Sequence, residues 1–315
     1  MKHCLYCYKP LAEGEVDFHG SCIKKFFGTT DLPEFPYSEA DLLEMAEEFI
    51  RSQKAITGVQ PKVSLEIEKP KREIPKLAIV GLWGDFILKL PNDEYAYMPE
   101  TESLTMYLGA TYGLNVVPFS LFRLQSGELA YLTRRIDRTK KEKLHMEDMC
   151  QLTERLTEDK YKGSYEQIGR VIRKYSANPG NDAITFFEVV LFSFLTGNSD
   201  MHLKNFSLIS LDGTAYQLTD AYDLISSKLL LPEDMEEMAL TINARKNKIA
   251  LKDFDALAAS LKIPEKVKEN LYKRFSNIWP KWENLMDTSF LPHELLIDYK
   301  KLILNKLNTL GFVKN

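Results

Sequence analysis

The sequence contains no apolar run long enough to cross a membrane. Its longest apolar stretch, residues 183–195, is 13 residues long and includes Glu188, whereas a bilayer requires about 20. The residues after Met1 also lack the apolar segment of a secretory leader. These absences predict a cytoplasmic protein with no membrane partner, and they make residues 183–195 a candidate buried helix.

The chain also lacks a strong excess of either charge. It contains 41 Lys and Arg residues and 45 Asp and Glu residues, which gives a formal net charge of -4 over 315 residues. This balance gives no reason to expect the whole chain to bind nucleic acid or an anionic membrane. The length suits two or three compact units.

Cysteine is scarce, and three of the four cysteines lie in the first 22 residues. A Cys-x2-Cys pair and a His-x2-Cys pair with this spacing suit one tetrahedral zinc ion in a structural role. A knuckle this small needs a metal to become ordered, so metal loss is expected to disorder residues 1–28 and spare the rest. His3 is an alternative ligand, reduced thiols without metal are the other interpretation, and Cys150 is expected to be buried alone. The predicted zinc ligands are Cys4, Cys7, His19 and Cys22.

The order of patterns along the chain predicts an α+β protein. A small Cys/His knuckle (1–30) precedes a β-rich lobe (31–136) and a mostly helical lobe (137–315). In the β-rich lobe we expect helices at 38–50 and 101–112, and strands at 63–67, 77–80, 85–90, 119–124 and 128–133. In the helical lobe we expect helices at 147–156, 164–175, 182–196 and several from 251 to 310, with a hairpin at 206–209 and 215–218.

A glycine-rich phosphate loop is missing. The segment 57–62 contains a single glycine, Gly58, and matches neither the Walker A loop nor the kinase G-x-G-x-x-G pattern. By itself this segment predicts only a turn.

One lysine, Lys89, lies inside the apolar strand 86–90. A lysine in a central strand is costly unless it is paired. Kinases place such a lysine on the α- and β-phosphates of ATP and hold it with a helix glutamate. Glu102 is the predicted partner and Glu100 the alternative, while an edge strand with the lysine facing water is the other interpretation.

The segment after the candidate buried helix carries Asp200 and, five positions later, Asn205; a short hairpin then leads to Asp223. Phosphoryl transfer needs a carboxylate that deprotonates the attacking hydroxyl and oxygen ligands that hold magnesium against the phosphates. Protein kinases place these groups in this order and at this loop spacing. We therefore predict Asp200 as the base and the other two residues as Mg²⁺ ligands, although Asp and Asn also favour turns.

Two further residues of this loop have open roles. His202 is expected to hold the loop's shape through hydrogen bonds, in preference to a metal or acid–base role. Lys204 either neutralises phosphate charge or is a solvated surface lysine.

These segments together resemble the HipA family of bacterial toxin kinases across roughly residues 50–310. The Glu-Asp-Met-Cys-Gln string at 147–151 and the Asp-x-His-x-x-Asn loop are the specific features. The other matching segments are 56–62, Lys89, 133–138, 198–205 and 222–224.

The resemblance implies a two-lobed protein-kinase-like fold and an ATP- and magnesium-dependent serine/threonine protein kinase. It implies that Arg134 and Ile136 form the adenine hinge, and that Thr57 is autophosphorylated in an inhibitory switch. The other interpretation of Thr57 is a β-branched residue that only favours an extended backbone before Gly58. The other residues implied at the nucleotide site are Gly58, Val59, Gln60, Lys62, Lys89, Glu102, His202, Asn205 and Asp223.

The resemblance also implies a place in a toxin–antitoxin system. The substrate would be a translation component such as an aminoacyl-tRNA synthetase, and a DNA-binding antitoxin would neutralise the toxin, so that DNA is contacted only through the antitoxin. Full-length relatives carry a small N-terminal subdomain before the Gly-containing loop, whereas only about 50 residues precede it here. The chain resembles the short variant in which a separate small protein supplies that piece.

Two other functions compete with the kinase. A pseudokinase could bind an antitoxin and DNA, but the presence of Asp200, Asn205, Asp223 and Lys89 argues against it. A small-molecule phosphotransferase of the aminoglycoside type has a similar catalytic loop, but the string at 147–151 favours the HipA interpretation.

Overall fold

The structure is a computed structural model of the chain, and it describes residues 2–38, 41, 62–70, 73–80, 84–139 and 142–313. The chain divides into two compact units. Most of the helix expected at 38–50 lies outside the described residues. Unit 1 comprises residues 1–103, 117–136 and 288–290; unit 2 comprises 104–116, 137–287 and 291–315.

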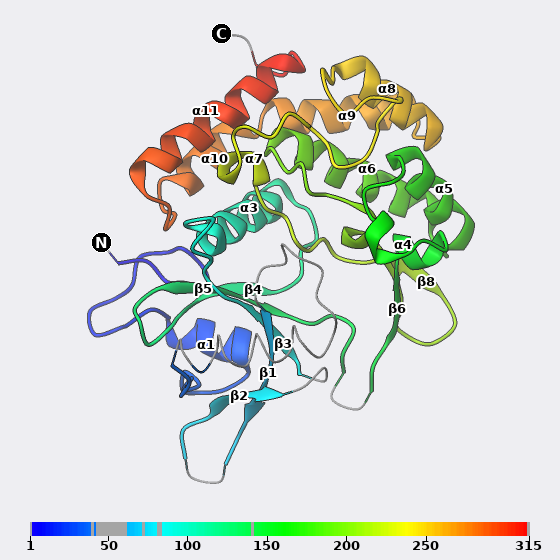
Figure 1. Cartoon of the computed structure of the whole chain (residues 1–315). Helices are drawn as coiled ribbons and strands as arrows, with labels where there is room; N and C mark the ends of the chain where they lie inside the picture. Colours follow the sequence, from blue (N-terminus) through cyan, green and yellow to red (C-terminus); the bar gives the residue numbers. More distant parts are fainter. Residues whose placement is uncertain are drawn as a thin grey trace. The chain divides into compact units, whose positions relative to one another are not determined.

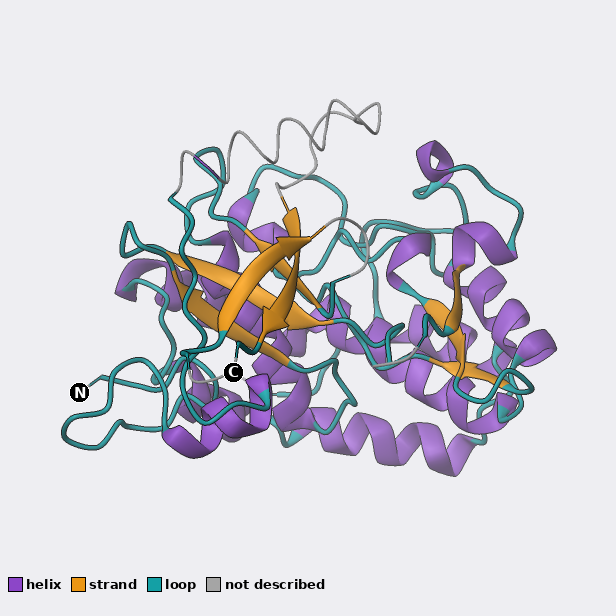
Figure 2. Ribbon diagram, turned by 90° about the horizontal axis from the view of Figure 1, so that it is seen from below, coloured by secondary structure: helices purple, strands orange, loops and turns teal. Residues whose placement is uncertain are grey.

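The centre of unit 1 is a five-stranded sheet, visible in Figure 2 as one curved layer. Its strand order is β2-β1-β3-β5-β4 with antiparallel neighbours, so β3 lies in the middle. The strands predicted in this part of the chain are confirmed to within about two residues at each end. They are β1 (Lys62–Glu68), β2 (Lys76–Val80), β3 (Phe86–Lys89), β4 (Phe119–Arg123) and β5 (Leu129–Arg134).

The cysteine-rich N-terminal segment packs into the same core as this sheet. It contains a helix that the sequence did not predict, α1 (Gly20–Phe27), which lies beside the strands in Figure 1. The ring centroids of Phe26 and Phe27 lie 5.8 and 6.2 Å from that of Phe86 on β3. The main chain of this segment is also hydrogen-bonded to the sheet, because the N–H of Leu121 on β4 donates to the carbonyl of Leu5 at 3.2 Å. The knuckle is therefore part of the hydrophobic core of unit 1.

Helix α3 (Met98–Tyr112) begins in unit 1 and continues in unit 2. The rest of unit 2 is mainly helical, and its long helix α6 (Pro179–Leu195) is buried along most of residues 183–195, as predicted. Proline suits the start of α6 because the first turn of a helix needs no N–H from that residue. Figure 1 shows α5 (Tyr165–Tyr175) beside α6, and these two helices pack together. The other α-helices described in this unit are α4 (Met149–Leu152), α7 (Ser227–Leu230), α8 (Leu251–Ser260), α9 (Glu265–Ser276), α10 (Trp279–Met286) and α11 (His293–Thr309).

Unit 2 also contains a three-stranded sheet, β6 (His145–Asp148), β7 (Ser207–Ser210) and β8 (Tyr216–Leu218), in that order. The predicted hairpin is therefore present as β7 and β8, but the helix predicted over 147–156 is wrong. Residues 147 and 148 end strand β6, because pairing with β7 overrides the local helix preference. Only the four-residue helix α4 follows.

No helix in the described part of the chain combines the length and apolar character needed to span a bilayer.

Candidate active site

The loop after α6 holds Asp200 by its main chain. Its N–H donates to Asn198 Oδ1 at 3.1 Å. Its carbonyl accepts from His202 N–H at 2.8 Å and from Asn205 Nδ2 at 3.0 Å. These hydrogen bonds fix the main chain that carries the Asp200 carboxylate. They also orient the Asn205 amide, because its nitrogen faces Asp200 and its oxygen remains as the atom suited to a cation.

Asp223 lies in the same unit and is held near this loop. Its φ of 54° places it in the left-handed region, which Asp tolerates better than most residues. The preceding Tyr222 donates its hydroxyl to the carbonyl of Lys204 at 3.0 Å and lies 2.6 Å from Ser207 Oγ. The segment that carries Asp223 is thereby tied to the loop that carries Asn205.

His202 is 5% exposed. Burial lowers its pKa, and the carboxylates of Asp200 and Asp223 only partly oppose that effect. The ring is therefore neutral at pH 7. Its Nδ1 has no hydrogen-bond partner within the described residues, so His202 supports the loop through its main-chain N–H, which donates to the Asp200 carbonyl.

Tyr161, which the sequence analysis did not single out, contacts the candidate base. Its hydroxyl donates to Asp200 Oδ1, and its ring meets the His202 ring edge-on, with centroids 5.0 Å apart. Burial first, and then the negative charge of Asp200, raise the pKa of Tyr161, so the phenol remains a donor. No local pattern could have identified this residue, because it precedes Asp200 by 39 positions.

The Glu-Asp-Met-Cys-Gln string supports the loop from another side. Asp148 caps α4 in a reciprocal pair with Gln151, at 3.0 and 2.9 Å. Its other oxygen, Oδ2, pairs with Lys204 Nζ at 2.6 Å. Lys204 is therefore anchored to Asp148, which neither of its two predicted roles included. Cys150 is buried, as predicted.

In unit 1, Lys89 Nζ pairs with Glu102 Oε1 at 2.7 Å. The lysine lies on the central strand β3, so the edge-strand interpretation and the alternative partner Glu100 are both wrong. Glu100 is instead buried, which raises its pKa to about 7. Lys62 on β1 stands directly opposite Lys89. Two like charges directly opposite each other are unfavourable, and the Glu102 carboxylate offsets the charge of Lys89.

The adenine hinge was predicted at Arg134 and Ile136, where unit 1 ends. The N–H of Arg134 already donates to the carbonyl of Pro118 at 2.9 Å, so that donor is not available to adenine. The carbonyl of Arg134 and the main chain of Ile136 remain as hinge candidates. The predicted phosphate loop, Gly58, Val59 and Gln60, and the predicted phosphorylation site Thr57 lie outside the described residues.

The four predicted zinc ligands form one group, here called the knuckle cluster (Cys4, Cys7, His19 and Cys22), whose ligand atoms all lie within 4.8 Å of one another. His19 Nδ1 is 3.3 Å from Cys7 Sγ and 3.6 Å from Cys22 Sγ, close to the ~3.6 Å edge of a zinc tetrahedron. His19 Nε2 donates to the carbonyl of Pro10 at 3.0 Å, which leaves Nδ1 free to bind a metal. These residues fit a zinc ion, and His3 is not part of the cluster.

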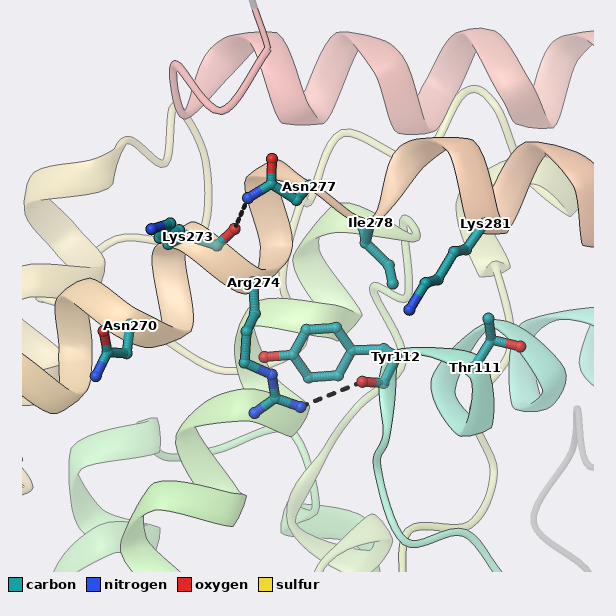
Figure 3. A pocket seen from close by; sticks show the side chains of 8 residues that line it. All are labelled: Thr111, Tyr112, Asn270, Lys273, Arg274, Asn277, Ile278 and Lys281. Atoms are coloured by element: carbon teal, nitrogen blue, oxygen red, sulfur yellow. Dashed lines mark hydrogen bonds between the residues drawn. The ribbon is translucent and has the colours of Figure 1, made fainter.

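Unit 2 also contains a cavity of about 510 Å³ (Figure 3). None of the predicted site residues lines it. Its cationic Arg274 is engaged by Glu188 at 2.7 Å and by the carbonyl of Tyr112 at 3.2 Å. The lining residues are Thr111, Tyr112, Asn270, Lys273, Arg274, Asn277, Ile278 and Lys281.

Comparison with known proteins identifies the family. The pattern described as the HipA-like C-terminal domain matches residues 54–282, which is more than half of the chain. The chain belongs to the HipA-like family.

Relatives of this HipA-like chain carry kinase names. "Putative kinase Y4dM" of Sinorhizobium fredii is 32% identical over 243 residues, which cover 71% of this chain and 59% of that protein. A "Putative kinase" of Haemophilus influenzae is 28% identical over 244 residues, which cover 72% of this chain and 68% of that protein. The match thus leaves about two fifths of the rhizobial relative without a counterpart here.

Solved structures share the fold. HipA of Shewanella oneidensis, in complex with HipB and its operator DNA, superposes with a TM-score of 0.67 at 21% identity, over 84% of this chain and 70% of that one. The proinflammatory kinase CtkA of Helicobacter pylori gives a TM-score of 0.54 at 14% identity, over 78% and 93%. The predicted kinase-like α+β fold is confirmed.

Proposed function

We propose that this HipA-like chain is an ATP- and magnesium-dependent serine/threonine protein kinase with Asp200 as its base. The observation that carries the proposal is the loop geometry, in which three hydrogen bonds fix the main chain of Asp200 and one of them orients Asn205. Asp200 would accept the proton of the acceptor hydroxyl. Asn205 and Asp223 would hold Mg²⁺, which when bound neutralises charge on the phosphates.

Unit 1 would supply the phosphate-binding residues. Lys89 is held by Glu102 in the arrangement that kinases use for the α- and β-phosphates, and Lys62 would add a second positive charge beside it. Gly58, Val59 and Gln60 are proposed to cover the phosphates. The carbonyl of Arg134 and the main chain of Ile136 are proposed to bind adenine.

The proposed biological role is that of a toxin in a toxin–antitoxin system. The Shewanella neighbour, solved with HipB and operator DNA, supports a DNA-binding antitoxin as partner. A translation component such as an aminoacyl-tRNA synthetase is the proposed substrate, and a separate small protein is a proposed further partner.

We also propose that Thr57 is an autophosphorylation site. A phosphate there would add about -1.5 to -2 charges beside the phosphates of ATP, and repulsion would lower ATP affinity. Mass spectrometry after incubation with Mg-ATP tests this: Thr57 that stays unmodified while substrate is labelled contradicts it.

The knuckle cluster is proposed to hold a structural zinc ion, because four protein ligands leave no position open for chemistry. Elemental analysis of freshly purified protein should find about one zinc per chain.

Incubation of the purified chain with γ-labelled ATP, Mg²⁺ and a cell lysate tests the activity. A labelled protein band that is lost in Asp200→Asn supports the kinase. A labelled small molecule instead indicates a small-molecule phosphotransferase, and no transfer indicates a pseudokinase. Asp200→Asn should still bind ATP, because the carboxylate is assigned to the acceptor and not to the nucleotide.

A further inference from the structure

Tyr161 contacts the proposed base but has no part in the proposed mechanism. Its hydroxyl donates to Asp200 Oδ1, its ring meets that of His202, and Lys160 Nζ lies 5.0 Å from its ring centroid. The side chain is 42% exposed, yet three neighbours hold it at the carboxylate.

The backbone around Tyr161 is tied down as well. The carbonyl of Lys160 accepts from Leu203 N–H, within the catalytic loop, at 3.1 Å. On the other side, the carbonyl of Gly163 accepts from Thr241 N–H at 3.3 Å. Because the chain is bound both before and after Tyr161, the contact with Asp200 follows from the fold and does not depend on the side chain alone.

The phenol presents to Asp200 the same group that an acceptor presents. A general base must lie within hydrogen-bond reach of the hydroxyl that it deprotonates, and Tyr161 already donates an O–H to that carboxylate. We propose that Tyr161 occupies the acceptor position at Asp200 and that a protein hydroxyl must displace it before transfer. This inference rests on the proposed kinase function.

After displacement, the acceptor O–H takes the place of the phenol O–H. The acceptor oxygen then bonds to the γ-phosphorus of ATP, the bond from that phosphorus to the leaving ADP oxygen breaks, and the proton passes to Asp200. Without an acceptor, the phenol excludes water from the same position. It thereby limits the transfer to water that would produce ADP and phosphate.

Tyr161→Phe tests this, because it keeps the ring and removes the hydroxyl, so water can reach Asp200. ADP release from Mg-ATP should be measured without a protein acceptor. We expect it to rise about fivefold or more, since a hydrogen bond to a charged group corresponds to roughly tenfold in an equilibrium. The KM for ATP should stay within about twofold, because the hydroxyl does not contact the proposed nucleotide residues.

Tyr175→Phe is a matched control. Tyr175 is 43% exposed, and Lys174 lies 4.6 Å from its ring centroid, as Lys160 does for Tyr161 at 5.0 Å. The substitution Tyr175→Phe also removes a phenol hydroxyl in unit 2, and it should leave ADP release unchanged. In the double variant Asp200→Asn/Tyr161→Phe, the rise in ADP release should disappear, because the base is gone.

The outcomes distinguish failure of the acceptor-position proposal from failure of the proposed kinase function. If Tyr161→Phe turns over ATP at or below the wild-type rate while Asp200→Asn shows that turnover needs the base, the acceptor-position proposal is wrong and Tyr161 merely supports the loop. Phosphate found on Tyr161 after incubation with Mg-ATP would also overturn it, since the phenol would then be an acceptor. If no variant shows turnover that depends on Asp200, the kinase proposal fails and this inference fails with it.

Discussion

Removing metal from the knuckle cluster should destabilise all of unit 1, and not only its first 28 residues. Sequence patterns alone predicted a loss restricted to residues 1–28. In the structure, however, that segment shares its core with the five-stranded sheet. Without the metal, the three cysteines and His19 no longer share one ion that would hold α1 and the preceding turn in place.

The expected loss of folding free energy follows from the side chains that would leave the core. Leu5, Phe18, Phe26 and Phe27 are between 0% and 4% exposed. At roughly 1.5–3 kcal/mol for each buried side chain, their loss would cost about 6–12 kcal/mol. That equals most of the ~5–15 kcal/mol stability of a typical domain, so the sheet should not survive intact.

Hydrogen exchange measured by mass spectrometry is the assay. Protein treated with a zinc chelator and a reductant should lose protection in β3 and β4 as well as in residues 2–28, and added zinc should restore it. Cys150→Ser is a control, because it removes a buried thiol outside the cluster and should leave unit 1 protected. The reasoning is refuted if metal-free protein exchanges only at residues 2–28 while β3 and β4 stay protected.

Three further predictions test the site. Asp223→Ala should weaken Mg-ATP binding by about tenfold or more, because an oxygen ligand is lost; calorimetry that shows unchanged affinity contradicts the assignment. Lys89→Met should destabilise unit 1 by about 3 kcal/mol, because it removes one partner of an ion pair whose Glu102 side chain is only 2% exposed. Adding Glu102→Gln should restore stability in urea unfolding but not ATP binding, and a Lys89→Met protein as stable as wild type argues against the pair. Asp148→Ala should lower the free energy of unfolding by about 1–2 kcal/mol, because the α4 cap and the ion pair with Lys204 are lost. Asp148→Asn should recover the cap. If wild type and both variants are equally stable in thermal unfolding, the cap contributes nothing.

Predictions that depend on neighbours in the chain succeeded. The hairpins β4–β5 and β7–β8 and helix α6 follow from alternation, turn residues and apolar content within short windows. The pairing of Lys89 with Glu102 could also be predicted, because a lysine inside an apolar strand requires a carboxylate and the next helix offers one nearby. The helix predicted over 147–156 failed because a strand distant in sequence, β7, pairs with its first residues.

The sequence by itself determined which chemical groups this protein carries and how far apart they lie along the chain. The spacing of Asp200 and Asn205, together with the hairpin and Asp223 after them, singled out the loop, and the spacing of the knuckle cluster singled out its four residues. The structure brings the members of each set close together. Only the tertiary structure decided that Tyr161 donates to Asp200 from 39 positions away and that Asp148 pairs with Lys204 across 56 positions. It also decided that Leu5 docks on β4. The physical reason is that such contacts depend on how separate elements pack, which residue type and local spacing do not encode.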